Sequence, residues 1–213
     1  MNTLQKTRFI GKPIVFLACL IPALLLVGDI LGLTGTLSAN PVEDILDRFG
    51  NWTLRFIMIT LAVTPLRQLT GWNWLSRFRR MLGLFTFFYA AMHFSTWLVL
   101  DRELRLADIS EDLIERPFIT LGFTAVVWLT ALALTSFTAV RRRMGRNWQT
   151  LHYSVYAIAV LGVWHYWWHV KKDVSEPIVY AAILTVLLGI RLLSYFRRRK
   201  TRRQSTHRPQ PRS

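Results

Sequence analysis

The chain has 213 residues, 52% of them apolar and 18% charged, and it carries 27 Lys and Arg residues against 12 Asp and Glu. Three uncharged stretches (Met81–Leu100, Phe118–Val140 and Leu151–Val170) each reach the roughly 20 residues with which a helix crosses a bilayer, which excludes an ordinary soluble domain. The net charge of +15 does not indicate a nucleic-acid partner, because the basic residues separate the apolar stretches instead of forming one surface.

The first apolar stretch follows three basic residues, Lys6, Arg8 and Lys12, as the core of a signal peptide does. No cleavage box of small residues follows promptly. We therefore interpret Ile14–Leu33 as a retained first membrane span, with a cleaved signal peptide as the alternative.

The sequence predicts an all-α membrane protein, a bundle of six transmembrane helices. No alternation of apolar and polar residues indicates a barrel, and helices pair their backbone groups within lipid. The second span is the weakest, because it is short and carries Arg55, whose side chain can reach the interface. The spans are expected at Ile14–Leu33, Trp52–Leu66, Met81–Leu100, Phe118–Val140, Leu151–Val170 and Pro177–Phe196.

Basic and acidic residues are divided between the two ends of these spans. The N-terminus, Arg67–Arg80, Arg141–Arg146 and the tail from Arg191 hold 20 basic residues and no acidic ones, whereas the other connections hold 7 basic residues and all 12 acidic ones. Because positively charged loops stay in the cytoplasm, both termini are expected there, with the chain in a bacterial inner membrane. The loop arginines can also contact anionic lipid, or bind carboxylate and phosphate groups of a cofactor.

Redox chemistry in this chain would need histidine ligands, because the only cysteine, Cys19, can neither pair nor hold an iron–sulfur cluster. His93 stands 8 residues before Asp101 and His165 stands 6 residues before Lys171, so the two lie at similar depth, within about 3 Å by helical rise. Two facing imidazoles can supply both axial ligands of haem b, and with them the haem iron. Packing histidines, and a proton relay or transport site, are the alternatives.

A third histidine, His152, lies 13 residues before His165, about 20 Å nearer the cytoplasmic face on the same predicted helix. That spacing suits a second haem, although the two rings would be about 140° apart around the helix axis. Arg79 and Arg80 stand on the third span where a histidine opposite His152 would be needed. His169, one turn after His165, is expected at the outer interface as a polar ring or an auxiliary ligand.

The outer connection Asp101–Glu115 is long and acidic, and it is predicted to contain a short amphipathic helix. It would suit the docking of a soluble partner with a basic face. A solvated loop without a partner is the alternative.

Six short motifs, in this order and spacing, resemble those of the YedZ/MsrQ family, the haem-binding membrane subunit of the periplasmic methionine sulfoxide reductase system. The resemblance covers roughly residues 10 to 200. The matching stretches are Asn40–Ile45 (NPVEDI), Arg79–Leu84 (RRMLGL), Ala90–Phe94 (AAMHF), Arg116–Gly122 (RPFITLG), Trp148–Tyr153 (WQTLHY) and Trp164–Tyr166 (WHY).

The resemblance implies a ferric-reductase-like transmembrane haem domain over residues 1–196, followed by a basic tail, 197–213, that we expect to be disordered. Carried over by position, the family's haem ligands fall on His93, His152 and His165. The wider ferric-reductase pattern has two histidines on the third span, and the chain departs from it at Arg79, which leaves one haem or two open. FMN, which the family is also described as binding, would lie at the cytosolic arginine loops, with Arg79 and Arg80 as candidate contacts.

The resemblance also implies a route for electrons. They would come from the quinone pool or a cytosolic flavin reductase and pass through haem b to a periplasmic molybdopterin-containing catalytic subunit, which reduces methionine sulfoxide in oxidised envelope proteins. The chain itself would be an electron-transfer subunit without catalytic residues of its own. The rival interpretation is a membrane transport or metal-binding protein whose histidines relay protons or hold an ion.

Overall fold

A computed structural model describes residues 5, 7–170 and 173–206 of the chain, and all the regular elements in this part are helical. The predicted all-α class is confirmed. The longer helices are α2 (Lys12–Ile30), α3 (Pro41–Thr70), α4 (Arg79–Thr96), α6 (Pro117–Leu134), α9 (Val155–His169) and α10 (Ser175–Thr206). The short ones are η1 (Thr7–Gly11), η2 (Asn73–Arg77), η3 (Trp97–Asp101), α5 (Leu106–Glu115), α7 (Thr138–Met144) and α8 (Arg146–His152).

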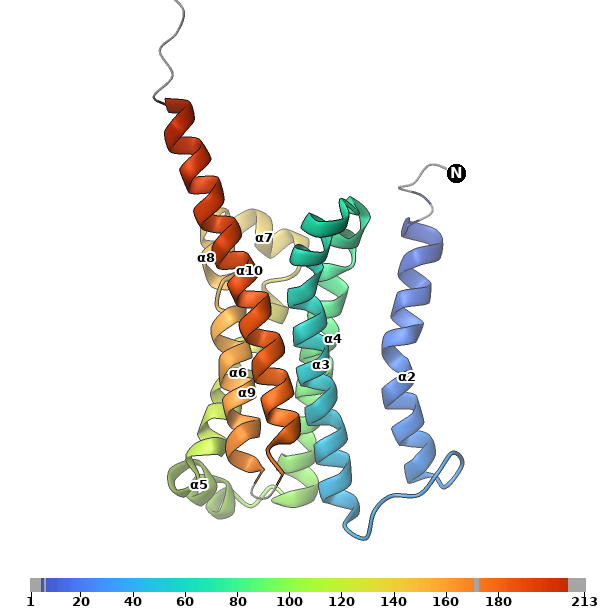
Figure 1. Ribbon diagram of the computed structural model, residues 1–213. Coiled ribbons are helices and arrows are strands. Elements are labelled where there is room, and N and C mark those ends of the chain that lie inside the picture. The colour runs from blue at the N-terminus through green and yellow to red at the C-terminus, as the bar shows by residue number, and fades with distance from the viewer. Residues whose placement is uncertain (1–4, 6, 171–172, 207–213) are drawn as a thin grey trace, which may run out of the picture.

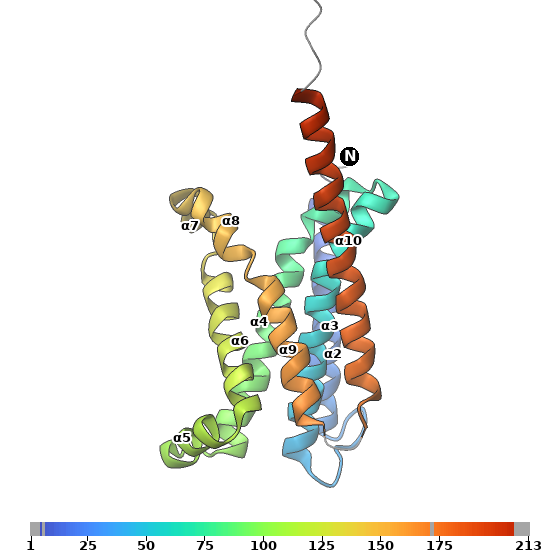
Figure 2. The same cartoon turned by 60° about the vertical axis from the view of Figure 1, so that its left-hand side comes forward.

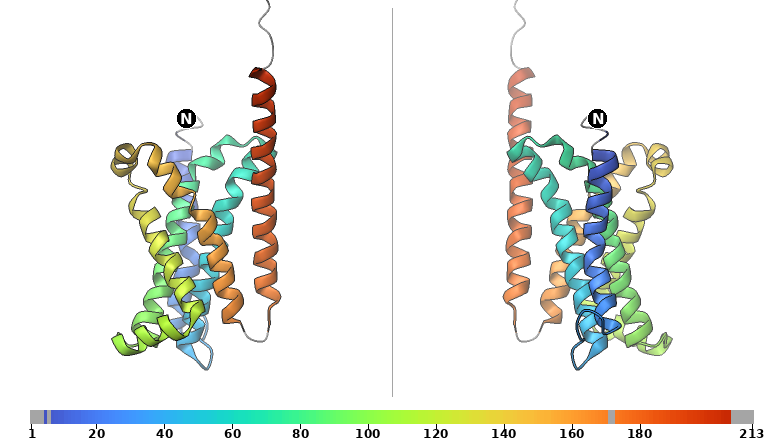
Figure 3. Two further views of the ribbon diagram at one scale, coloured as in Figure 1. Left: turned by 90° about the vertical axis from the view of Figure 1, so that its left-hand side faces the viewer. Right: turned by 90° about the vertical axis from the view of Figure 1, so that its right-hand side faces the viewer.

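The longer helices run side by side and alternate in direction, so that the start of α2 and the end of α10 lie at the same end of the bundle (Figure 1). That end, here the termini end, also carries α7 and α8 (Figure 2). At the other end, here the α5 end, α5 projects sideways. Helix α2 stands at one edge of the bundle, and α10 extends beyond the other helices at the termini end (Figures 1 and 3).

Among the residues that the structure describes, four helical stretches are long and apolar enough to cross a membrane: Thr7–Ile30, Arg79–Asp101, Pro117–Leu134 and Ser175–Arg197. Large apolar side chains such as Leu24, Leu134 and Leu193 are exposed on the outside of the bundle, where lipid would cover them. Helices α3 and α9 pack among these stretches. Helix α9 has only 15 residues, and α3 carries several charged side chains along its 30 residues.

The predicted spans differ from the helices in three places. The expected fifth span, Leu151–Val170, is not continuous: α8 ends at His152, and α9 begins at Val155 after a turn. The expected second span begins too late, since α3 starts 11 residues earlier, at Pro41. The fourth span also ends early, because α6 stops at Leu134 and the chain turns before α7.

The basic tail begins as helix, since α10 continues to Thr206, ten residues beyond the expected domain end at 196. The expectation that the tail is disordered stays a prediction. Its last part, 207–213, which includes His207, lies outside the described residues.

The early start of α3 follows from its first residues. The Asn40 side chain accepts a hydrogen bond from the backbone N–H of Glu43, and Pro41 occupies the first helical position, where no N–H is needed. The Asn40 amide in turn donates to the Glu43 carboxylate at 2.9 Å. This cap fixes the register of the first turns of α3, where part of the site lies.

Pro22 in α2 and Pro65 in α3 each leave a backbone carbonyl without a helical partner, and an arginine donates to one of these carbonyls. Pro65 cannot donate to the carbonyl of Leu61, four residues earlier in α3. Arg191 of α10 donates to that carbonyl at 2.5 Å and also to the hydroxyl of Tyr156 on α9. Arg191 thus joins three helices, α3, α9 and α10.

A tyrosine attaches the edge helix α2. The hydroxyl of Tyr89, a fully buried residue of α4, donates to the carbonyl of Cys19 at 2.7 Å and accepts from the N–H of Ala23 at 3.2 Å. These two backbone groups would otherwise bond each other next to Pro22, so the hydroxyl is inserted into the hydrogen-bond ladder of α2.

The Arg191 contact can be tested with a double-mutant cycle. Arg191→Met should lower the free energy of unfolding in detergent by about 1–3 kcal/mol, because the Leu61 carbonyl is left buried and unpaired. In a Pro65→Ala background the loss should be smaller, because Ala at position 65 supplies the missing N–H. Thermal unfolding of the four proteins measures both losses, and equal losses would contradict this role for Arg191.

Candidate functional site

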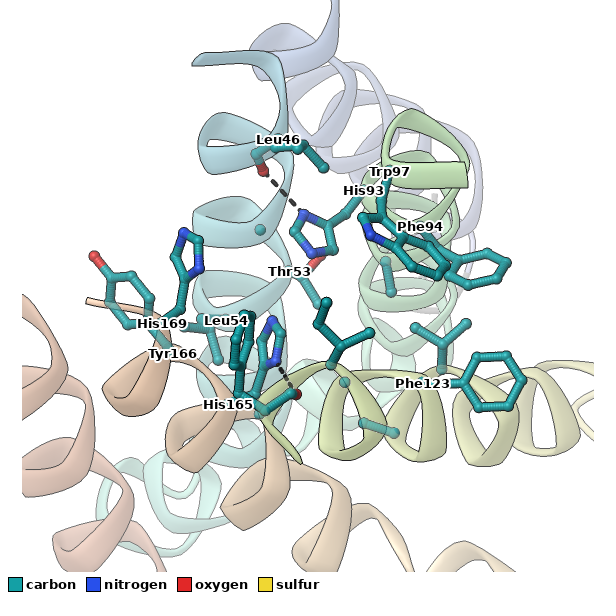
Figure 4. Close-up of a pocket in the computed structure, with 18 of the residues that line it drawn as sticks. Leu46, Thr53, Leu54, His93, Phe94, Trp97, Phe123, His165, Tyr166 and His169 are labelled. Atoms are coloured by element: carbon teal, nitrogen blue, oxygen red, sulfur yellow. Dashed lines mark hydrogen bonds between the residues drawn. The ribbon is translucent and has the colours of Figure 1, made fainter. Parts of the chain in front are cut away.

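A cavity of about 250 Å³ lies in the bundle between α3, α4, α6 and α9, towards the α5 end. Most of its wall is apolar, formed by side chains such as Leu54, Ile57 and Leu129. Two imidazoles, those of His93 on α4 and His165 on α9, face into it from opposite sides (Figure 4). The structure therefore brings together the two histidines that sequence depth places level.

Each imidazole is held by one backbone carbonyl. The Nδ1 atom of His93 lies 2.9 Å from the carbonyl oxygen of Leu46 on α3, and the Nδ1 atom of His165 lies 2.7 Å from that of Phe118 on α6 (Figure 4). A carbonyl can only accept, so Nδ1 carries the proton in both rings and Nε2 keeps its lone pair. The ring centroids are 6.1 Å apart, with the planes at 81°.

Two glycines make room for these rings, and sequence reasoning had given neither a role. A Cβ atom on Gly50 would lie 3.2 Å from Nδ1 of His93, and one on Gly122 would lie 2.9 Å from the ring of His165. Each glycine stands four residues after the carbonyl that accepts from the histidine. A glycine inside an apolar helix, four residues after a possible acceptor, is the signal that could have found them.

The two halves of the cavity repeat each other with an offset of 72 residues. This offset relates Leu46 to Phe118, Gly50 to Gly122 and His93 to His165, and it also relates many of the apolar lining residues. In each half the hydrogen bond joins residues 47 positions apart. The helix pair α3–α4 is thus matched by the pair α6–α9, an internal repeat that the sequence alone had not revealed to us.

The repeat also separates His169 from the histidine pair. Its counterpart, 72 residues earlier, is Trp97 rather than a histidine. Both residues line the cavity nearer the α5 end. The His169 ring stacks on that of His165 with centroids 6.5 Å apart, and its Nε2 lies 3.9 Å from Asp47.

The remaining candidates lie elsewhere in the fold. His152 ends α8 at the termini end, outside the cavity, where its ring stacks on Trp148 at 4.0 Å. Its Nε2 lies 3.1 Å from the hydroxyl of Thr135. Arg79 and Arg80 begin α4 at the same end and are exposed, so the structure does not join them or His152 to the histidine pair.

The donor set of the cavity fits a flat, largely apolar metal cofactor such as haem. An imidazole nitrogen lies roughly 2 Å from a first-row metal ion that it binds, and about 1 Å from its own ring centre, so two rings sharing one ion have centroids about 6 Å apart. The observed 6.1 Å between His93 and His165 agrees with this value. The apolar wall would cover a porphyrin, and the backbone carbonyls supply the outer hydrogen bonds that orient histidine ligands.

Known proteins with similar sequences include subunits named as heme-binding. The family described as "Ferric reductase like transmembrane component" matches residues 49–163 of the chain. Several curated relatives carry the name protein-methionine-sulfoxide reductase heme-binding subunit MsrQ. The one from Ralstonia nicotianae is 52% identical over 84% of this chain and 82% of its own length.

Two further relatives with this name cover still more of the chain. The Bordetella pertussis protein is 47% identical over 90% of this chain and 94% of its own length. The Xanthomonas oryzae protein is 45% identical over 99% of this chain and 98% of its own length. The chain therefore belongs to the MsrQ family of membrane subunits of the protein-methionine-sulfoxide reductase system, with a ferric-reductase-like transmembrane domain.

Proposed function

We propose that this chain binds haem b between His93 and His165 and carries electrons through it to a methionine sulfoxide reductase partner. The observation that carries the proposal is the pair of imidazoles, each fixed at Nδ1 by a carbonyl and 6.1 Å apart across an apolar cavity. The relatives named above are described as heme-binding subunits, which supports the same cofactor.

The residues suit electron transfer rather than oxygen chemistry. When bound, haem b supplies reversible one-electron redox chemistry at its iron. His93 and His165 would hold the haem through their Nε2 atoms and would leave no open position for oxygen. The carbonyls of Leu46 and Phe118 hold the two rings in one tautomer and one orientation, so both histidines would already be positioned to bind the haem.

The proposal includes six membrane spans in a bacterial inner membrane. The helices α3 and α9 would be spans along with the four stretches that are long and apolar enough. The start of α2 and the end of α10 lie at one end together with the arginine-rich α7. Because cytoplasmic loops are the basic ones, this termini end would face the cytoplasm. The cavity then opens towards the periplasm.

The partners we propose follow from that orientation. Electrons would enter from the quinone pool or from a cytosolic flavin reductase and leave to a periplasmic molybdopterin-containing subunit that repairs oxidised envelope proteins. The acidic face of α5, with Asp108, Glu111 and Glu115, is our candidate for its docking surface.

At the termini end we place the expected second cofactor, another haem or FMN, near His152, Arg79 and Arg80. The arrangement of residues supports this second site less than it supports the haem between His93 and His165. The His152 ring faces Thr135 and Trp148, and no second imidazole opposes it among the described residues. One haem per chain at His93 and His165 is therefore the core of the proposal.

The rival, a transport or metal-ion protein, gains little from the geometry. Across the described residues no three His, Cys, Asp or Glu side chains are grouped so as to hold a metal ion. A bare ion in the cavity would be bound by two imidazoles alone, fewer ligands than the four usual for zinc.

Histidine variants test the ligand assignment. His93→Ala and His165→Ala should each lower the haem bound per purified chain by at least about tenfold, because one axial ligand is lost. His169→Ala, the matched control one turn away, should keep nearly all of it. Absorption spectra of the purified variants give the readout. Loss of haem from His169→Ala but not from His165→Ala would place the ligand one helical turn away.

Glycine variants test how the rings are seated. Gly122→Ala should displace the His165 ring, because the added methyl would lie 2.9 Å from it, and should lower haem content strongly. Gly50→Ala should have a smaller effect, because its methyl would meet His93 at 3.2 Å. Gly83→Ala is the control, since the nearest atom would be 3.9 Å away. Full haem content in Gly122→Ala would contradict the seating described here.

A further inference from the structure

The polar groups of the cavity are gathered at its α5 end. There the wall includes Arg102, directly after η3, and Arg116, directly before α6. The opposite, deeper part of the cavity is lined by apolar residues such as Ile57, Leu129 and Ile158. A ligand that fills the cavity thus meets charge at one edge only.

A buried carboxylate holds the two arginines in place. Asp112 of α5 is only 4% exposed, and its oxygens lie 2.5 Å from Nε of Arg102 and 3.3 Å from Nε of Arg116. Arg102 also lies 3.4 Å from Asp101 through Nη2. A guanidinium has five N–H donors, so these contacts leave further donors on both side chains.

A third donor beside them has no partner. The indole Nε1 of Trp97 is buried and makes no hydrogen bond among the described residues, although the side chain lines the cavity. Figure 4 shows this nitrogen on the edge of the indole that faces His93. An unpaired buried N–H costs free energy, so it indicates an acceptor that a bound ligand would supply.

The rest of the rim would repel an anion. On the α3 side the cavity is lined by Glu43 and Asp47. The mouth therefore has an acidic half on α3 and a second half where the N–H donors of Trp97, Arg102 and Arg116 lie, with Asp101 paired to Arg102 beside them. A dianionic edge would be drawn to the second half.

We infer that Arg102, Arg116 and Trp97 bind the two propionate carboxylates of the haem, and that Asp112 is the residue that positions the arginines. The inference rests on the proposed function. It deepens that function by fixing which edge of the porphyrin faces the α5 end. The guanidinium fork and a carboxylate form a strong, charge-assisted pair, and the indole adds a neutral hydrogen bond.

Haem and its dimethyl ester, in which both carboxylates are blocked, separate this contact from the axial ligands. The detergent-solubilised full chain, stripped of cofactor, is reloaded with each, and loss of the porphyrin to apomyoglobin is timed by absorbance. The wild type should release the ester roughly 10- to 100-fold faster than haem, the range expected for one or two hydrogen bonds to charged groups.

Three variants should reduce the difference in release rate between haem and its ester, a fourth should recover part of it, and a control variant should keep it. Arg116→Gln, Arg102→Gln and Trp97→Phe should release haem faster and discriminate less between haem and its ester, while Arg116→Lys should recover part of the difference. Arg105→Gln is the matched control, because Arg105 lies on the same segment but is exposed and pairs with Glu103. Size-exclusion elution and helical circular dichroism confirm that each variant is folded.

The outcomes are distinct. Equal release of haem and ester by the wild type would overturn the inference and leave the haem proposal standing. A wild-type preference that all three variants retain would overturn the assignment to these residues. A chain that takes up neither porphyrin would overturn the proposed function itself, and the inference with it.

Discussion

Each central imidazole is tied at one nitrogen to a backbone carbonyl of a neighbouring helix, and this bond determines what the other nitrogen can do. His93 and His165 cannot turn away while Leu46 and Phe118 accept from their Nδ1 atoms. Their Nε2 atoms are then left facing the cavity, ready to bind. The bond requires that helix and ring approach closely, which only Gly50 and Gly122 permit. The cap at Asn40, far in sequence from His93, matters because it fixes where the Leu46 carbonyl lies.

The site is built twice from the same parts, and the two copies differ where the chemistry needs them to differ. Each helix pair supplies one acceptor carbonyl, one glycine and one histidine, and the corresponding residues of the two pairs are 72 positions apart. At the rim of the cavity, residues 72 positions apart are of different kinds: Trp97 corresponds to His169, and Arg116 corresponds to the acidic Asp44. A symmetric centre suits two equivalent axial ligands, whereas an asymmetric rim can select one edge of a bound porphyrin. These two properties would hold and orient an electron carrier in a membrane.

Much of this arrangement could be read from sequence, and the part that could not has physical causes. Apolar runs and charge asymmetry predict the helical class, and counting residues from Asp101 and Lys171 places His93 and His165 level. The count from His152 to His165 assumed one continuous helix, whereas a turn at 153–154 separates α8 from α9, and the His152 ring lies beside Thr135. The glycines were missed because glycine is common in membrane helices for packing reasons alone. The repeat was missed because few of the paired residues are identical, Gly50 with Gly122 and His93 with His165 being exceptions.

The central claim is that one metal centre is bound by two imidazoles within this chain. The most direct measurement is the absorption spectrum and haem content of the full chain, purified in detergent from haem-replete cells. We expect a red preparation with the reduced-minus-oxidised bands of a six-coordinate bis-histidine haem b and at least one haem per chain. A colourless preparation, or the spectrum of a five-coordinate haem with an open axial position, would contradict the account.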